Sequence, residues 1–210
     1  MSVKRLLMVA FLTVTATSLI ASAQENQLSG LIGRTFISDQ GIIGATFTNP
    51  TVHFGNGLTF EANYGRHLLG QGFTRLYFEV PAEFNFDEDL NAGANVIPEN
   101  YKSFFVAPSA RANFFAMTAI NPWLSFGGGF AHFSESSNLV FGGPNPGKTG
   151  TTTGAMQFGA GLDVRFKPRW MVRGGIRDFW TGTPELNVNT GKSHQHNYFV
   201  GGGIVWLFGK

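Results

Sequence analysis

Few stretches of this chain combine residue types at spacings that chemistry could use. The first is Gly142–Thr149, which fits G-x-x-x-x-G-K-[ST], a loop whose backbone amides cradle phosphates. That loop needs a strand before it and a helix after it, so that a helix N-terminus also faces the phosphates. Here Gly-Thr-Thr-Thr-Gly follows, which does not favour a helix. We therefore interpret the match as a coincidence and predict no cofactor site.

Two clusters carry side chains that metals use as ligands. His194 and His196 lie two residues apart and could share one face of a strand. Asp87, Glu88 and Asp89 could hold a hard cation, or bridge lipopolysaccharide through one. Because neither cluster is joined by a second ligand motif, we interpret both as parts of solvated loops. We predict no metal site.

A serine–histidine pair could be drawn from Ser134, Ser136, His132 and His194. Nucleophilic catalysis needs a nucleophile, a base and a group that orients the base, all within hydrogen-bond reach. No spacing in the sequence singles out such a set. We predict no catalytic residue and a non-enzymatic function.

The elements that would position any site are β-strands, and the clearest are the two arms of residues 154–180. Along the first arm, apolar and polar residues alternate strictly: Met156, Phe158, Ala160, Leu162, Val164 and Phe166 against Gln157, Gly159, Gly161, Asp163 and Arg165. Only a two-residue period sorts them this way, which predicts a strand. The alternation resumes at Trp170, so the two arms form a hairpin. Each arm has about ten residues, close to the ~9–11 that a tilted strand needs to cross a bilayer.

Periodicity does not say which face lies inside a barrel. In a soluble barrel the apolar residues fill the interior, whereas in a membrane barrel they face lipid. Phe158 and Asp163 point in opposite directions in the two arrangements. Their orientation therefore decides between them.

The N-terminus favours export. Lys4 and Arg5 precede an uncharged, mostly apolar run over residues 6–20, and Ala21-Ser22-Ala23 has the small residues of a cleavage site. We predict a signal peptide over residues 1–23, cleaved after Ala23, and a barrel domain over 24–210. The chain has 15 Lys+Arg and 13 Asp+Glu, and the loss of Lys4 and Arg5 balances them, so no basic surface argues for nucleic acid.

Eight stretches are predicted as strands: residues 28–37, 58–67, 73–84, 102–115, 123–133, 155–166, 170–180 and 196–208. The connections between them alternate between long and short. Long loops at one end and tight turns at the other are typical of an outer-membrane barrel. We therefore predict an all-β, eight-stranded, antiparallel up-and-down transmembrane β-barrel.

Two residue sets follow from that architecture. Aromatic residues near the strand ends are predicted to form girdles at the two membrane interfaces: Trp123, Trp170, Trp180, Tyr198, Trp206 and Phe208. Charged residues on the polar faces are predicted to form an ion-pair network that plugs a narrow lumen, because unpaired buried ions are costly: Arg75, Glu79, Glu83, Arg111, Asp163, Arg165, Arg173 and Arg177.

The pattern resembles the OmpA-type family of small outer-membrane β-barrels over nearly all of residues 24–210. Segments 159–165 and 177–180 and the glycine-rich strand 201–208 resemble the paired last strands of such proteins. The resemblance implies outer-membrane lipid and lipopolysaccharide as surroundings, the barrel-assembly machinery as a partner during insertion, and a monomer. Two alternatives stay open: a secreted soluble barrel that binds an apolar ligand, and an outer-membrane lipid-modifying enzyme.

Overall fold

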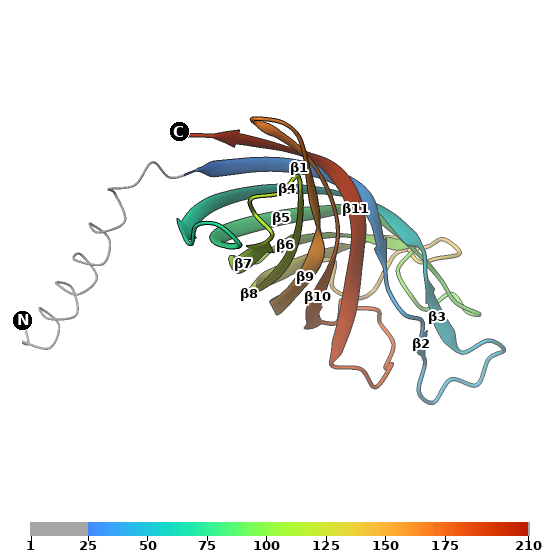
Figure 1. Ribbon diagram of the computed structural model, residues 1–210. Helices are drawn as coiled ribbons and strands as arrows, with labels where there is room; N and C mark the ends of the chain where they lie inside the picture. The colour runs from blue at the N-terminus through green and yellow to red at the C-terminus, as the bar shows by residue number, and fades with distance from the viewer. Residues whose placement is uncertain (1–24, 210) are drawn as a thin grey trace, which may run out of the picture.

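The computed structural model describes residues 25–209, and these form a closed β-barrel (Figure 1). The predicted signal peptide and its cleavage site lie outside the described residues. Within residues 25–209, no helix is long and apolar enough to cross a membrane.

The barrel wall is a single antiparallel ring. Its strands are β1 (Asn26–Phe36), β4 (Asn56–Leu69), β5 (Thr74–Asn91), β6 (Asn100–Val106) with β7 (Ser109–Phe114), β8 (Ile120–Glu135), β9 (Thr151–Lys167), β10 (Trp170–Gly182) and β11 (His194–Phe208). Each strand pairs with its sequence neighbour, and β1 closes the ring on β11 from Asn26↔Phe208 to Phe36↔Tyr198. Because β6 and β7 follow one another along the same line of the wall, they count as one barrel strand. The ring therefore has eight such strand positions, which we call staves. The predicted fold class is confirmed.

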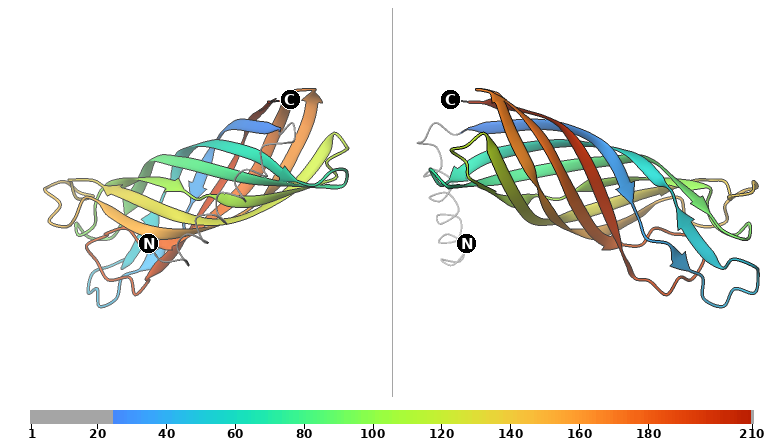
Figure 2. Two further views of the ribbon diagram at one scale, coloured as in Figure 1. Left: turned by 90° about the vertical axis from the view of Figure 1, so that its left-hand side faces the viewer. Right: turned by 45° about the vertical axis from the view of Figure 1, so that its right-hand side comes forward.

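Connections of different length gather at opposite ends of the barrel (Figure 2). The segments 37–55, 92–99, 136–150 and 183–193 lie at one end, which we call the long-loop end. The turns 70–73, 115–119 and 168–169 lie at the other, the short-turn end, together with the start of β1 and the end of β11. The first long loop also carries β2 (Gln40–Gly41) and β3 (Thr51–Phe54), which the sequence did not predict.

Strand β5 is longer than predicted. The prediction ended this strand at residue 84 and placed Asp87–Asp89 in a solvated loop, which is wrong, because β5 continues to Asn91. Beyond a bulge after Asn85, Glu88 pairs with Tyr101 of β6, and β3 pairs with the last residues of β5. The acidic residues therefore lie on a strand whose hydrogen-bond partners come from distant segments.

The predicted strand 102–115 is split in two at Ala107 and Pro108. Proline has no N–H for the ladder, and Pro81 lies at the same place on β5. Two backbone bonds keep the wall together there: Ala107 N donates to Pro81 O (3.3 Å), and Gly128 N donates to Pro108 O (3.2 Å). The staves remain continuous across the break.

The orientation of β9 decides which face is inside. Phe158 is 45% exposed on the outer surface, whereas Asp163 is 0% exposed inside the barrel. Leu162 and Val164 are also exposed on the outer surface. The apolar residues point outward and the charged residues point inward, the reverse of a soluble barrel that holds an apolar ligand. That alternative is wrong for the geometry of this chain.

Candidate functional site

The middle of the lumen holds a cluster of buried ion pairs, which we call the lumen network. It consists of six side chains: Arg111, Arg173, Arg177, Glu61, Glu79 and Asp163. They come from β4, β5, β7, β9 and β10, and all are essentially inaccessible to solvent. The network therefore ties distant staves of the wall together through the interior.

Two arginines share Asp163. Arg173 approaches it with two N–H groups, Nε to Oδ1 at 2.7 Å and Nη2 to Oδ2 at 2.8 Å. Arg111 Nη1 lies 3.3 Å from Oδ2, and Asn113 donates to the same oxygen at 3.1 Å. A two-pronged guanidinium–carboxylate pair fixes geometry as well as charge. Asp163 is thereby held rigidly on the inner face of β9.

Arg177 links the remaining two carboxylates. Its Nε donates to Glu61 (2.8 Å) and its Nη1 donates to Glu79 (2.8 Å) and to the Ser125 hydroxyl (3.0 Å). Glu79 also pairs with Arg111, whose Nε lies 2.9 Å away. Three guanidinium groups thus face three carboxylates, so the cluster is electrically balanced.

Five of the eight predicted lumen charges belong to this network: Glu79, Arg111, Asp163, Arg173 and Arg177. Arg75 instead pairs with Glu25 (3.6 Å) at the short-turn end, and Arg165 lies half-buried near the same end without an ion pair among residues 25–209. The prediction also omitted Glu61. Its alternation with Leu58, Phe60 and Ala62 places it on the inner face, so the sequence contained the signal.

The prediction for Glu83 is wrong. It was predicted to pair with an arginine, but it is 0% exposed and neither of its carboxylate oxygens has a hydrogen-bond partner among the described residues. Its cross-strand neighbour is Glu61, another acid. Arg177 reaches Glu61 but makes no ion pair with Glu83. Because an unpaired buried carboxylate is costly, Glu83 is an unfavourable position for a charge.

The prediction that Trp123 belongs to an aromatic girdle is also wrong, because it lies in the lumen. Only 2% of it is exposed, and the guanidinium carbons of Arg173 and Arg177 lie 5.5 and 5.0 Å from its ring centroid. Glycines make the room: a Cβ on Gly161 would overlap the indole. Trp123 lies two and four residues before the inward-facing Ser125 and Gly127, whereas its direct neighbour Leu124 faces outward. The alternation along the strand therefore predicts that Trp123 faces the lumen.

The other predicted girdle residues lie on the outer surface. At the short-turn end, Trp206 stacks with Trp170 and Phe208 at centroid distances of 6.4 and 4.9 Å. Trp180 and Tyr198 lie toward the long-loop end. Trp170 and Trp180 bound the outer face of β10, and about ten residues at ~3.3 Å each, tilted by ~40°, give about 25 Å. That is the height of the apolar band on an outer-membrane barrel.

A cluster of apolar side chains lies in the lumen on the long-loop side of the network, and the sequence did not predict it. Phe105 packs against Phe179 and Phe133 at centroid distances of 4.9 and 6.0 Å. Ile97 and Leu186, which lie in loops at the long-loop end, also belong to this cluster. The interior therefore has an ionic layer and, nearer the long loops, an apolar layer.

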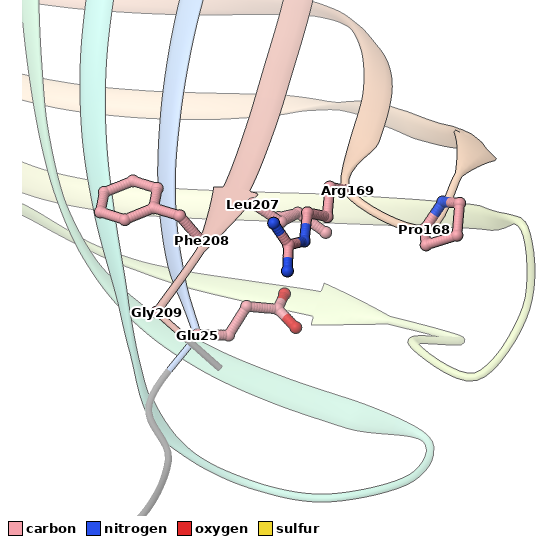
Figure 3. A pocket seen from close by; sticks show the side chains of 6 residues that line it. All are labelled: Glu25, Pro168, Arg169, Leu207, Phe208 and Gly209. Atoms are coloured by element: carbon pink, nitrogen blue, oxygen red, sulfur yellow. The ribbon is translucent and has the colours of Figure 1, made fainter.

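A small cavity of about 180 Å³ lies at the short-turn end (Figure 3). It is lined by Glu25, Pro168, Arg169, Leu207, Phe208 and Gly209, and the side chains of Arg169 and Glu25 point toward one another. Leu207 N donates to Arg169 O at 2.9 Å. The cavity lies where the ends of β1 and β11 meet the turn between β9 and β10, and it has no set of groups suited to catalysis.

The remaining motifs do not form the sites that their spacing suggested. Gly142 and Gly143 have φ of +91° and +93° in an irregular loop, and the next element is strand β9, not a helix. His132 Nδ1 bonds the Thr152 hydroxyl (2.8 Å), not a serine. His194 and His196 stack on Trp180, and the described residues contain no cluster of three or more His, Cys, Asp or Glu suited to a metal.

Glu88 lies on β5 beyond the aromatic Phe84 and Phe86, at the long-loop end. Burial raises the pKa of its carboxyl from 4.5 to about 7, and the neighbouring Asp89 and Asp87 add to the rise. Hydrogen bonds from Asn85 Nδ2 (2.8 Å) and Gly57 N (3.2 Å) oppose it. Glu88 therefore takes up a proton more readily in the folded barrel than in the unfolded chain.

This shift predicts that the stability of the β5–β6 tip, where Glu88 and Asp89 pair with Tyr101 and Asn100, depends on pH. Between about pH 4.5 and about pH 7 the folded state binds the extra proton, so the tip is most stable below that window and loses stability as the pH rises through it. Hydrogen exchange of the β6 amides, corrected for intrinsic rates, should show less protection at about pH 8 than at about pH 5. Glu88→Gln should remove the difference. An equal pH dependence in the variant would contradict the assignment.

The chain matches no family model, and its sequence matches no curated protein. Solved structures do share the fold. Neisserial surface protein A is 14% identical with a TM-score of 0.50, covering 89% of this chain and 98% of that one. The outer membrane protein OprG from Pseudomonas aeruginosa is 7% identical with a TM-score of 0.52, covering 89% and 96%. The outer membrane protein AlkL, in lipid bilayers, is 12% identical with a TM-score of 0.50, covering 89% and 90%. At these identities the similarity shows the barrel fold.

Proposed function

We propose that this protein is an integral outer-membrane β-barrel of a Gram-negative envelope, without enzymatic activity, that serves a structural or surface-interaction role. The observation that carries the proposal is the inversion of the barrel, with Phe158 and Leu162 outside and Asp163 inside. A surface of that kind is stable in lipid and unstable in water. The neighbour OprG is an outer membrane protein, and AlkL was solved in a bilayer, which supports the same setting here.

The filled interior supports a barrier rather than a pore. The lumen network crosses the lumen, and the apolar cluster lies across it on the long-loop side. Two layers of buried side chains across the lumen favour a barrier over an open pore. The surface-exposed loops at the long-loop end are then the part of the protein that meets the outside.

The resemblance to the OmpA-type family extends the proposal. We place the protein as a monomer in outer-membrane lipid and lipopolysaccharide, inserted by the barrel-assembly machinery after export and cleavage following Ala23. The expected absence of catalysis, cofactors and metals is part of the same proposal. The aromatic residues Trp170 and Trp206 at one end and Trp180 at the other mark the proposed membrane interfaces.

Cell fractionation and heat modifiability test this function together. The expressed full-length chain should pellet with the outer membrane and resist extraction at high pH. In detergent its gel mobility should shift on heating, because a closed barrel stays folded until it is boiled. Recovery of the folded protein in the soluble periplasmic fraction would overturn the proposal.

A further inference from the structure

Among residues 25–209, Glu83 is a buried acidic side chain without a counter-charge. The lumen network contains three guanidinium groups and three carboxylates, so it is electrically balanced by itself. Glu83 adds a fourth carboxyl group to the same buried part of the barrel, with 0% of its surface exposed. An ionised Glu83 would give the middle of the lumen one surplus negative charge. A charge in a low-dielectric interior needs a partner or is neutralised by a proton.

The neighbours of Glu83 supply no positive charge of their own. Its cross-strand neighbour on β4 is Glu61, and its neighbour on β6 is Phe105 of the apolar layer. Arg177 of β10 pairs with Glu61 and Glu79 and, within the described part of the chain, makes no ion pair with Glu83. The charged groups around Glu83 are therefore two acids and a guanidinium group that these two acids already share.

Three carboxyl oxygens at this pair of acids are buried and have no hydrogen-bond partner among the side chains and backbone of residues 25–209. They are both oxygens of Glu83 and Oε1 of Glu61, whose Oε2 accepts the bond from Arg177 Nε at 2.8 Å. Directly opposed residues on neighbouring strands have Cβ atoms about 5 Å apart, which lets two carboxyl groups meet. Two carboxylates that share such a site cannot both ionise without strong repulsion. A carboxylic acid, by contrast, can donate its O–H to a carboxylate.

We infer that the folded barrel binds one proton in its lumen, carried by Glu83 and donated as a hydrogen bond to Glu61 Oε1. The proton is taken from water as the barrel folds: it forms an O–H bond with one Glu83 oxygen, and the carboxylate becomes a neutral acid. Three guanidinium groups then face three carboxylates, and the surplus charge is gone.

A metal cation fits this position less well than a proton. Hard cations take about six oxygen ligands, whereas three oxygens without a partner are available at the two acids. The guanidinium group of Arg177, which already pairs with Glu61, also repels a second cation. The inference goes beyond the proposed function, because it depends on the buried lumen and not on what surrounds the barrel.

Infrared spectroscopy of the folded full-length barrel tests the inference, because the C=O stretch of a carboxylic acid differs in frequency from that of a carboxylate. Every protein measured carries Glu88→Gln, which removes the glutamate whose pKa is raised to about 7. At about pH 7, where an ordinary glutamate is ionised, this parent protein should show the band of one protonated carboxyl group. Adding Glu83→Gln should abolish the band. Adding Glu99→Gln, which removes an exposed carboxyl group at the long-loop end, is the matched control and should leave it unchanged.

The pH dependence of stability gives a second readout. A proton that only the folded barrel holds stabilises it less as the pH rises, because the unfolded chain has already released its proton above the ordinary glutamate range. Between about pH 5 and about pH 7, the folding equilibrium constant of the parent should therefore fall by about tenfold more per pH unit than that of the Glu83→Gln variant. The constant is measured by urea unfolding of both proteins in lipid vesicles.

The absence of a carboxylic acid band from the parent would overturn the inference, and so would a band that survives Glu83→Gln. Parallel pH profiles of the two proteins would do the same. The heat-induced mobility shift is recorded for every variant, so that only folded barrels are compared. A proton assignment that fails while the shift persists leaves the proposed function intact, whereas loss of the shift in the wild type contradicts that function itself.

Discussion

Replacing Arg177 by leucine is expected to cost the folded barrel about 3–5 kcal/mol, because it removes one partner of a buried ion-pair cluster and leaves the others charged. Arg177 donates to Glu61, Glu79 and Ser125, and its guanidinium lies 5.0 Å from the centroid of the Trp123 ring. Without it, Glu61 loses its ion pair and Glu79 keeps only Arg111 and Asn63, next to the already unpaired Glu83. The change is measured as a shift in the urea concentration at which half of the protein in lipid vesicles is unfolded. The folded fraction is read from the gel band that shifts on heating.

Two variants control for the charge itself. Arg75→Leu removes the same side chain from the partly exposed pair with Glu25, and its expected cost is about 0–1 kcal/mol. Glu83→Gln removes a carboxylate that has no cationic partner, and it should be neutral or stabilising. A loss for Arg177→Leu no larger than that for Arg75→Leu would show that the network does not stabilise the barrel.

Placing a cation on the outer surface is expected to have an effect of similar size. Leu162 is exposed in the middle of β9, across from Gly174 and Pro122. If that surface faces lipid, Leu162→Arg should destabilise the barrel in vesicles by about 2–4 kcal/mol, the cost of arginine at the bilayer midplane. In a water-soluble barrel the same substitution would lie within about 0.5 kcal/mol of the wild type.

The depth dependence of the penalty provides the control. Phe166 is on the same outward face of β9, but close to the turn at the short-turn end. Phe166→Arg should cost only about 0–1 kcal/mol, because a long cationic side chain reaches the interface from there. Equal penalties at the two positions would argue against a bilayer around this surface.

The sequence was sufficient to predict the eight staves and the alternation of two faces along each of them. A strict two-residue period leaves one free choice, inward or outward, and the orientation of Phe158 and Asp163 settles it. Strand ends were harder to predict, because beyond the apolar band both faces of a strand can be polar. Asp87–Asp89 therefore resembled a loop, although their inward neighbours Glu88 and Leu90 are buried.

The composition of the lumen network could be predicted only in part. Parity alone places Arg111, Arg173 and Arg177 inside, but the partner of each depends on how far the staves are staggered around the ring. Glu61 and Glu83 face each other across one ladder, yet only Glu61 is within reach of Arg177. Periodicity contains no information on that stagger, so Glu83 was predicted to be paired.

Trp123 shows a second limit of sequence reasoning. A tryptophan near a strand end favours a membrane interface, and this preference outweighed the parity that places Trp123 beside Ser125. The glycines at 161 and 175 were visible in the sequence, but their effect appears only in three dimensions, where they make room for an indole from another strand. Likewise, the apolar layer around Phe105 gathers side chains from β6, β8 and β10 that no local pattern connects.

Spin-label accessibility along β9 tests the inverted barrel most directly. The chain contains no cysteine, so single-cysteine variants at Ala160, Leu162 and Val164 can each carry one label without background. In lipid vesicles, labels at all three positions should collide readily with dissolved oxygen, which concentrates in the bilayer, and rarely with a water-soluble nickel complex. Labels that are instead open to the nickel complex, or shielded from both reagents inside the protein, would contradict an apolar surface turned toward lipid.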